Sequence, residues 1–346
     1  MATLKDISRL LGLSVTQVSR ALGGYADVSD ETRKRVADAA RQLGYRPNPT
    51  ALKLRSGRSG IVGLVVPENS EQEESNILLE ILLGLAVEFW KRDVLVVLNV
   101  MPKAGKTVDS YTRLFRQGAV DGFVVVNPSF DPSGIDFLAQ SKVPFVAHGR
   151  DRPKPHYPFV DLDNRRVGTI IASQLVALGH RNIAFIDGPE NSYSAQERLR
   201  GLSEVLARHR HRPKDAFICR GIMTEHFGQS ATHRLFQSAA APPTAIMVGN
   251  LVLATGVMRA LRELGLSVPG DISVMAHDDA LTRYPRSGIT PDLSGTVSPF
   301  SDAWVEIANF LTAAIDGQSP HSLRHLIAPL YVEGRSIAPL AVTRPR

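Results

Sequence analysis

Apolar residues recur every three or four positions along residues 4–11 and again along 15–22, which predicts two short amphipathic helices. Gly12 lies between them and fits a tight turn. Each helix has its own start signal with the spacing of a capping box, Thr3 with Asp6 and Ser14 with Gln17. The pattern therefore predicts a compact pair of helices at the start of the chain.

A third helix is predicted between Ser29 and Gly44. Asp30 and Glu31 supply acidic side chains to its first turn, where the helix dipole favours them, and apolar positions continue to Leu43. Three small helices that share one apolar face would form a head that ends near residue 46.

The next segment has room for only about two turns of helix, between Pro49 and the Ser56-Gly57 pair, which is too short for stability in water. Two interpretations stay open. The segment is a flexible linker, or it is a hinge helix that orders only when docked on DNA. In the second case Leu54, flanked by Lys53 and Arg55, would insert between base steps in a minor groove.

From residue 60 the pattern changes to apolar strands that alternate with Leu- and Ala-rich helices. The strands are predicted at 61–66, 94–100, 123–126 and 143–147, and in a second series at 183–186, 217–219, 245–248 and 272–275. Two such series predict two parallel-sheet lobes with helices on both faces. A ligand is expected at the carboxyl ends of the strands, in the cleft between the lobes.

The first two helices have the spacing and the caps of a helix-turn-helix, although any two-helix corner shares part of this pattern. Val15, Thr16, Gln17 and Arg20 would lie on the exposed side of the second helix, from which a recognition helix contacts base edges. Charge supports the DNA-binding interpretation. Residues 1–60 contain 11 Lys and Arg against 5 Asp and Glu, whereas the remaining residues contain 29 of each.

The amino-acid composition indicates the cellular compartment in which the protein is expected. A single cysteine, Cys219, excludes a disulfide framework and fits a reducing cytoplasm. The N-terminus lacks the apolar core of a secretion signal, and no run approaches the roughly 20 apolar residues that span a bilayer. We therefore expect a cytoplasmic protein with no contact with a membrane.

The chain resembles LacI/GalR-family transcriptional regulators over nearly its whole length. In the head and hinge the resemblance lies in Thr-Leu-Lys-Asp-Ile at 3–7, Val-Ser-Arg-Ala-Leu at 18–22, Gly-Tyr-Arg-Pro-Asn at 44–48 and Leu54. Further motifs lie at 120–122, 178–181, 198–201, 269–274 and 335–336. The resemblance implies a helix-turn-helix domain at 1–46, a hinge helix at 47–58, and a two-lobed, type I periplasmic-binding-protein-like α/β body at 60–346 that binds an effector and dimerises.

The resemblance also implies partners and the residues that contact them. The partners are a near-palindromic double-stranded operator, read by a homodimer, and a small effector. The residues implied in DNA binding are Thr3, Ser14, Val15, Thr16, Gln17, Ser19 and Arg20 in the head, with Asn48, Ala51, Leu54 and Arg55 in the hinge. Gln17 stands where the family usually has Thr, so it can serve the helix cap as well as base readout.

Seven residues are candidates for the effector pocket, of which Arg198, Asn250 and Asp278 match family positions and Arg150 follows the fourth strand, although each could instead form an interlobe ion pair or a helix cap. They are Arg150, Phe159, Asp161, Ser194, Arg198, Asn250 and Asp278. Polar planar groups beside an aromatic ring suit a sugar, and the recognition-helix sequence resembles regulators of glucoside uptake, so an α-glucoside is the first expectation.

Three departures from the family pattern affect this pocket. Leu251 replaces an acid, Ser298 stands where many relatives have Gln, and the acidic segment 67–76 is longer than usual and is expected to be a solvated surface loop.

No constellation for catalysis, metal or cofactor binding stands out. Asp278 and Asp279 are adjacent and point apart, and His209 and His211 lie in a basic tail without Cys or carboxylate companions. The prediction is a non-catalytic, effector-controlled repressor. The alternatives are a solute-binding protein without a DNA role, a sugar-metabolising enzyme, or a regulator with a nucleoside or purine effector. The absence of a heptad tail favours a dimer over a tetramer.

Overall fold

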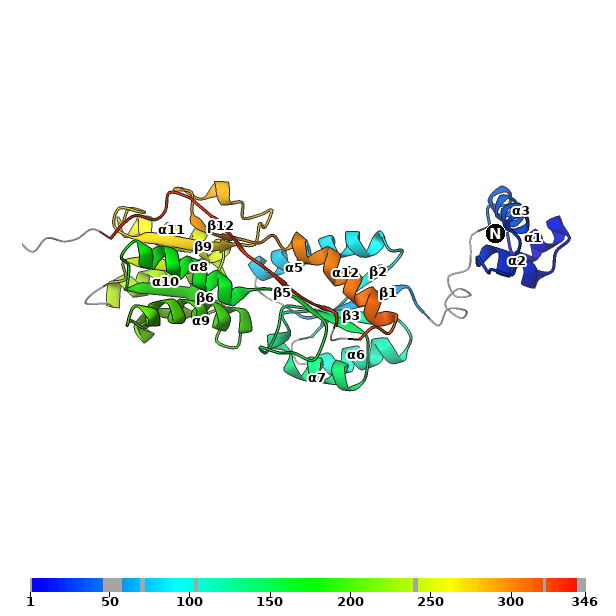
Figure 1. The fold of residues 1–346 in the computed structure, drawn as a ribbon, viewed down its shortest axis with the longest axis horizontal. Coiled ribbons are helices and arrows are strands. Elements are labelled where there is room, and N and C mark those ends of the chain that lie inside the picture. The colour runs from blue at the N-terminus through cyan, green and yellow to red at the C-terminus, as the bar shows by residue number, and fades with distance from the viewer. Residues whose placement is uncertain are drawn as a thin grey trace, which may run out of the picture. The chain divides into compact units, whose positions relative to one another are not determined.

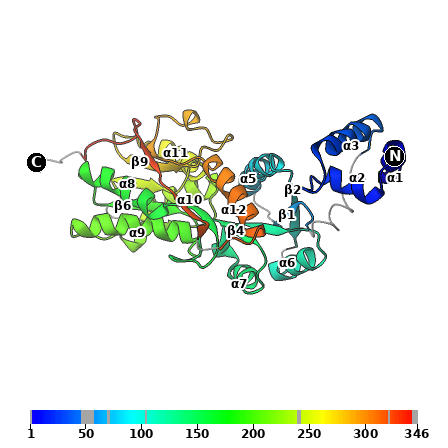
Figure 2. The ribbon, with the colours of Figure 1, turned by 45° about the vertical axis from the view of Figure 1, so that its right-hand side comes forward.

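The computed structural model describes residues 2–45, 58–68, 72–102, 105–238, 242–319 and 322–340, with the backbone alone for 72–76 and 238. The chain divides into two compact units, Met1–Ser59 and Gly60–Arg346. Figures 1 and 2 show the elements of each unit. The two units are described separately below.

The first unit contains the predicted three helices, α1 (Leu4–Leu11), α2 (Val15–Leu22) and α3 (Asp30–Gln42). Ile7, Val18 and Val36 are fully buried where the helices meet. A head of this size has little apolar surface to bury, so its caps contribute a large share of its stability.

Both predicted capping boxes form in the first unit. The backbone N–H of Thr3 donates to Asp6 Oδ2 at 2.8 Å, and the backbone N–H of Gln17 donates to the Ser14 hydroxyl at 3.1 Å. Gly12 ends α1 with φ +66°, a left-handed conformation that side chains other than glycine rarely adopt. The turn between the helices therefore depends on a glycine at this position.

The first lobe of the second unit is a parallel sheet of six strands among the described residues, in the order β11-β5-β4-β3-β1-β2. The strands are β1 (Ile61–Pro67), β2 (Leu95–Met101), β3 (Gly122–Val126), β4 (Phe145–His148), β5 (Phe159–Leu162) and β11 (Arg324–Ile327). Helices α5 (Gln72–Trp90) and α12 (Ser301–Ile315) share one apolar cluster with the sheet, and α6 (Thr107–Arg116) and α7 (Pro132–Gln140) share another.

The second lobe has the same layered arrangement. Its sheet has six strands within the described ranges, in the order β12-β10-β9-β8-β6-β7, with β12 antiparallel to β10. They are β6 (Ile183–Asp187), β7 (Ile218–Arg220), β8 (Ala245–Val248), β9 (Ser273–Asp278), β10 (Ser294–Val297) and β12 (Leu330–Val332). Helices α8 (Asn164–Ala177) and α9 (Tyr193–Arg208) cover one face, and α10 (Glu225–Ser238) and α11 (Leu251–Glu263) cover the other.

The chain crosses between the two lobes after β5, after β10 and after β11. The first lobe therefore contains α12 and β11 from the end of the chain, and only part of it comes from the first series of strands (Figure 1). The predicted strands are present in both lobes, and the two-lobed α/β body is confirmed. The two series predicted from the sequence are not the two lobes, because α12 and β11 return to the first.

The predicted surface loop at 67–76 is wrong in its second half, because α5 begins at Gln72. Glu73 and Glu74 follow that start directly. Acidic residues near a helix N-terminus interact favourably with its dipole, so the acidic run is compatible with a helix start as well as with a loop.

Candidate functional site

The second helix of the head presents exposed residues at its N-terminal end. Val15, Thr16 and Gln17 are exposed there, and Arg20 is half-buried one turn later. Gln17 Oε1 accepts a hydrogen bond from the backbone N–H of Ser14 at 3.0 Å, so its carboxamide oxygen already serves the cap. The amide nitrogen of Gln17 keeps its donors for another partner.

Arg20 is held in one orientation by its neighbours. Its Nη2 donates to Asp27 Oδ2 at 2.5 Å, and its guanidinium carbon lies 4.8 Å from the centre of the Tyr25 ring. The guanidinium lowers the pKa of the Asp27 carboxyl, so this pair remains charged at neutral pH. An arginine that is fixed in this way is preorganised for a second planar partner.

The other residues implied in DNA binding fall into two groups. Thr3, Ser14 and Ser19 lie in the described head, where Thr3 and Ser14 are used by the capping boxes. Four residues of the hinge lie outside the described residues: Asn48, Ala51, Leu54 and Arg55. The hinge helix therefore stays a prediction.

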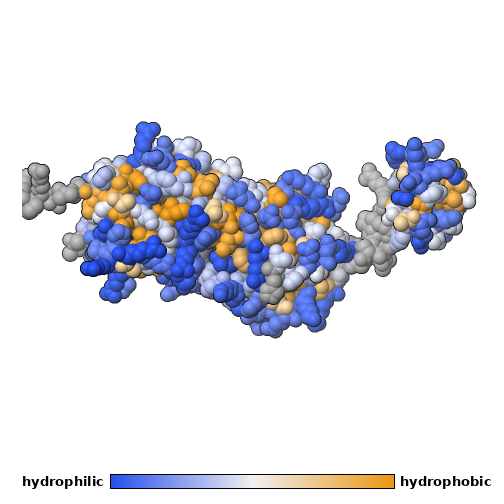
Figure 3. Space-filling model, viewed as in Figure 1, coloured by the Kyte–Doolittle hydropathy of each residue, from blue (hydrophilic) through white to orange (hydrophobic). Residues whose placement is uncertain are grey.

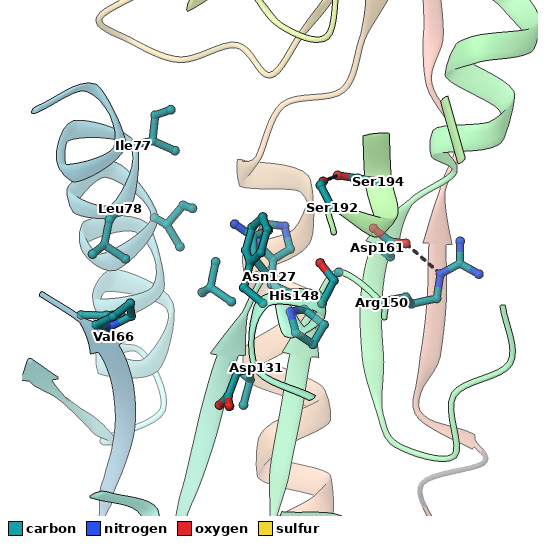
Figure 4. Close-up of a pocket in the computed structure, with 18 of the residues that line it drawn as sticks. Val66, Ile77, Leu78, Asn127, Asp131, His148, Arg150, Asp161, Ser192 and Ser194 are labelled. Atoms are coloured by element: carbon teal, nitrogen blue, oxygen red, sulfur yellow. Dashed lines mark hydrogen bonds and ion pairs between the residues drawn. The ribbon is translucent and has the colours of Figure 1, made fainter. Parts of the chain in front are cut away.

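The body contains a cavity of about 1030 Å³ between its two sheets, at the carboxyl ends of the strands (Figure 4). Val66, His148 and Asp161 line it from the first lobe, and Arg198 and Asn250 line it from the second. A cleft of this size at the carboxyl ends of two parallel sheets is where α/β proteins hold small ligands.

Arg150 follows β4 and pairs with the end of the neighbouring strand. Its Nε donates to Asp161 Oδ2 at 2.7 Å, and this pair is drawn in Figure 4. Its guanidinium also lies 5.4 Å from the centre of the Phe159 ring and 5.6 Å from that of Tyr193, on α9 of the other lobe. Burial raises the pKa of Asp161 to about 6, because desolvation outweighs the attraction of Arg150.

Arg198 forms a second buried pair behind the opposite wall. Its Nε and Nη2 each donate to one oxygen of Asp187 at 2.7 Å, and its Nη1 donates to Asn164 Oδ1 at 2.5 Å. Asn164 Nδ2 contacts Asp161 Oδ1 at 3.5 Å. Asn164 therefore links the arginine pairs of the two lobes where the chain crosses between them.

Asn250 and Ser194 complete the polar wall of the second lobe. Asn250 Oδ1 caps α11 by accepting from the backbone N–H of Leu253 at 3.0 Å, which leaves its amide nitrogen for another contact. The Ser192 and Ser194 hydroxyls are 2.9 Å apart. Ser298, one of the departures from the family pattern, also lines the cavity.

Two of the residues predicted at the pocket are not among those that line it. Phe159 is the first residue of β5, three positions before its end, and packs in the core of the first lobe. Asp278 ends β9 and accepts from the backbone N–H of Ala280 at 2.7 Å, whereas the next residue, Asp279, lines the cavity. One position along the chain changes the side to which a side chain points, so these assignments are sensitive to the exact end of each strand.

Sequence reasoning missed most of the first-lobe wall. Figure 4 shows Asn127, Asp131 and His148 on this wall. Burial lowers the pKa of His148 from its ordinary value of 6.5 to about 4, so the imidazole is neutral at physiological pH. The available signal was a polar residue directly after a run of apolar strand residues, as in Val-Val-Val-Asn and Phe-Val-Ala-His.

An apolar region of the cavity adjoins these polar groups. Ile77, Leu78 and Ile81 of α5 line it together with Phe300 before α12. The ring of His148 packs edge-on against Phe300, with 5.5 Å between the ring centres. The cavity therefore offers apolar surface next to hydrogen-bonding groups, as most small-molecule sites do.

The described residues contain no group of three or more His, Cys, Asp or Glu side chains that could hold a metal ion. A search of the described helices finds none long and apolar enough to cross a membrane.

Comparison with known families and proteins gives two domain matches and full-length relatives. Residues 3–48 match bacterial regulatory proteins of the lacI family, and residues 172–337 match the periplasmic binding protein-like domain. The chain is 38% identical to the HTH-type transcriptional regulator AglR of Rhizobium meliloti over 93% of this chain and 90% of that protein. It is 33% identical to the HTH-type transcriptional regulator RafR of Escherichia coli over 97% of this chain and 98% of that protein.

Solved structures agree with these matches. A transcriptional regulator CelR–cellobiose complex is 27% identical, with a TM-score of 0.70 over 97% of this chain and 100% of that chain. The lac repressor dimer bound to operator and the anti-inducer ONPF is 25% identical, with a TM-score of 0.77 over 97% of this chain and 99% of that chain.

Proposed function

The chain belongs to the lacI family of bacterial regulatory proteins, and we propose that it is a transcriptional repressor whose affinity for operator DNA is set by a small molecule bound in its cavity. One observation carries the proposal: a capped helix pair with exposed recognition residues and a polar interlobe cavity occur in one chain. A protein that reads DNA in response to a ligand needs both.

The head supplies the DNA contacts in this proposal. Val15, Thr16 and Arg20 read base edges in the major groove, with a smaller contribution from Gln17 because of its role in the cap. Arg20 is suited to guanine, with which arginine forms two hydrogen bonds. Leu54, in the predicted hinge, inserts into the minor groove. The protein acts in the cytoplasm, where its operator lies.

The effector is a sugar in this proposal. Arg198 and Asn250 offer donors, Asp161 and Asp279 offer acceptors, and the wall around Phe300 offers an apolar face for a ring. The related regulator CelR was solved as a complex with cellobiose. An α-glucoside is the class to test first.

The second copy of the repressor binds an exposed apolar face of the first lobe. Leu79, Leu83, Val87 and Trp90 form a stripe along α5, and they are between 52% and 72% exposed. The edge strand β2 adds exposed Leu95, Val97, Leu98 and Val100. Figure 3 shows apolar side chains at the surface of the body. A contiguous apolar face of this kind on a folded protein marks an interaction site.

Binding of the effector and of DNA are coupled in this proposal through the angle between the lobes. A ligand that contacts both walls favours one angle, and that angle alters the spacing of the two hinges in a dimer. Thermodynamic linkage then requires that the coupling is reciprocal. Operator DNA must change the affinity of the protein for the effector by the same factor as the effector changes its affinity for operator DNA. Equal effector affinities with and without the operator would contradict the coupling.

The test combines operator selection with deletion of the head. The full chain is expected to select and protect a near-palindromic DNA site, and a bound sugar is expected to change that protection. A fragment of residues 60–346 should bind the same sugar in isothermal titration but lose DNA binding. Sugar binding without any selected DNA site would favour a solute-binding protein, and turnover of the sugar would favour an enzyme.

A further inference from the structure

We infer that the effector carries no net negative charge, so that the cavity accepts an uncharged polyhydroxylated ligand and rejects uronates, sugar phosphates and nucleotides. This inference rests on the proposed function, because it concerns the same cavity and specifies the ligand further. It is argued from the balance of charges on the cavity walls.

Both arginines of the cavity are already neutralised by buried carboxylates. Arg150 pairs with Asp161 at 2.7 Å, and the two side chains are 10% and 8% exposed. Arg198 forms its two hydrogen bonds with Asp187, and these side chains are 6% and 0% exposed. An arginine with its own buried counterion offers N–H donors to a ligand but little net positive charge.

The remaining charges make the walls negative. Among the described residues that line the cavity, the basic ones are Lys106, Arg150 and Arg198, and the acidic ones are Asp109, Asp131, Asp161 and Asp279. The carboxylate of Asp187 behind Arg198 adds to the acidic side. His148 contributes no charge, because burial lowers its pKa to about 4. An anionic ligand would therefore meet described walls whose net charge has its own sign.

The free-energy cost of placing an anion beside like charges is larger inside a cavity than at the protein surface. A carboxylate or phosphate that enters loses most of its hydration, and that loss must be offset by unpaired positive groups. The arginines could supply such groups only by giving up Asp161 or Asp187, which would leave a buried carboxylate without its partner. If the arginines keep their partners, the negative charge of the ligand is buried without a counterion. If they give them up, the charge of Asp161 or Asp187 is.

Hydroxyl groups fit the same walls without this difficulty. A hydroxyl can donate to Asp279 or Asp161 and accept from the remaining N–H groups of Arg198 or the amide of Asn250. His148 Nδ1 is buried and has no hydrogen-bond partner among the described residues, and a neutral imidazole nitrogen can pair with a hydroxyl in either direction. Figure 4 shows His148 facing the cavity across from Ser192 and Ser194. Neutral sugars and nucleosides both meet this requirement.

The test compares neutral ligands with anionic counterparts that keep the same ring. The full chain is titrated calorimetrically with methyl α-glucoside and methyl α-glucuronide, galactose and galacturonate, and adenosine and its monophosphate. The neutral member of at least one pair should bind, and its anionic counterpart should bind at least about tenfold more weakly. An anion that binds as tightly as its neutral counterpart would overturn the inference while leaving an effector-controlled repressor in place. A panel in which neither member of any pair binds would count against the proposed effector class, and with it against the inference.

A variant makes the cavity accept anions. Asp161→Asn removes the counterion of Arg150 with almost no change in shape, so the anionic member of the binding pair should gain about tenfold in affinity. The double variant Arg150→Gln with Asp161→Asn should lose that gain, because the freed positive charge is gone. A cooperative thermal unfolding transition and a circular dichroism spectrum like that of the parent show that each variant is folded.

A matched control is available on the same loop. Asp151 pairs with Arg152 at 2.5 Å, as Asp161 pairs with Arg150, but neither residue lines the cavity. Asp151→Asn also removes a carboxylate from an arginine, which keeps a second partner in Asp136 at 3.5 Å, and it should leave the preference for neutral ligands unchanged. An equal gain for anions in Asp151→Asn would show that overall charge, and not the pairing inside the cavity, sets the preference, and would refute the inference.

Discussion

Two titratable side chains of the cavity, His148 and Asp161, have pKa values that burial shifts in opposite directions. That of His148 falls from 6.5 to about 4, and that of Asp161 rises from 3.8 to about 6. Burial disfavours the charged form of each group, which is the imidazolium in one case and the carboxylate in the other. Their contributions to stability therefore change with opposite sign over the same range of pH.

The stability of a His148→Gln variant should depend on pH differently from that of the parent. The folded protein holds this histidine neutral, so its contribution is complete above about pH 6.5 and is lost as the pH falls toward about 4. The loss approaches about 3 kcal/mol, because one pKa unit corresponds to about 1.4 kcal/mol. Urea unfolding at several pH values should show the variant gaining on the parent as the pH falls.

The control for this measurement is Asp161→Asn, which should give the reverse trend. The raised pKa of Asp161 means that the folded protein binds its proton more readily, so stability is gained as the pH falls from about 6 toward 3.8. The asparagine variant should lose ground to the parent over that range. Parallel pH profiles for parent and His148→Gln would contradict the assignment of a neutral, desolvated imidazole.

At the scale of residues, the sequence predicted pocket residues best where they lie in a family motif or at the end of a predicted strand. Arg150, Asp161, Arg198 and Asn250 were predicted at the pocket and line the cavity. His148 was missed because its signal, one polar residue after a run of apolar strand residues, is weak. Its surroundings come from Phe300, far away in sequence, and only the folded chain brings the two together.

At the scale of elements, the turn between α1 and α2 is where the sequence most tightly specifies the head. Gly12 has φ +66°, and a Cβ added there would meet no atom within 4 Å. Gly12→Ala should therefore cost about 1 kcal/mol through backbone strain alone, since no steric clash is involved. Amide exchange of the full chain should show about fivefold less protection in residues 4–42 and no change in the body.

Gly23 offers a matched control for that substitution. It also follows a helix of the head, but its φ is −83°, which any residue can adopt. Gly23→Ala should leave exchange in the head unchanged or slower. Equal loss of protection in both variants would mean that the added methyl group, and not the left-handed backbone, destabilises the head.

Helix α5 shows why some elements were harder to predict. The acidic run at the start of this helix has no apolar periodicity that would mark a helix, so its charged residues favour a loop when the sequence is considered alone. The helix is fixed by tertiary contacts, since Ile81, Leu85 and Phe89 pack against the sheet and α12. The contacts with α12 join segments more than 200 residues apart, which local pattern cannot reveal.

At the scale of the whole molecule, the exposed stripe of α5 leads to a prediction about assembly. Leu83 is 59% exposed in the middle of the stripe, and Leu83→Asp would bury a charge in the proposed interface. The variant should shift the protein from dimer to monomer in sedimentation velocity and weaken operator binding at least tenfold, as about 1.4 kcal/mol or more would. Binding of the sugar should survive.

The control lies at the opposite edge of the same sheet. Leu326, on β11, is 44% exposed, and the sheet order puts β11 and β2 at opposite ends. Leu326→Asp should leave the dimer intact. Dissociation by this variant, or an unaffected dimer with Leu83→Asp, would place the interface elsewhere.

The connections between segments far apart in the sequence also explain which parts of the fold could be predicted. Eight strands were visible in the sequence because buried strands are continuous apolar runs, whereas β5, β11 and β12 were not predicted. The return of α12 and β11 to the first lobe was not visible, because α12 has the same apolar periodicity whichever sheet it covers. Assignment of an element to a lobe depends on pairing partners, and a single sequence does not specify these.

The three crossings between the lobes have a consequence for synthesis of the protein. A nascent chain begins the first sheet at β1, but the helix that covers Val124, Val146 and Val160 is α12, which ends at Ile315. On the ribosome that apolar surface stays open while the central strands of the second lobe are already available to fold. The lobe that is started first is therefore still open when most of the second lobe has been made, and its uncovered face is where a chaperone would bind the growing chain.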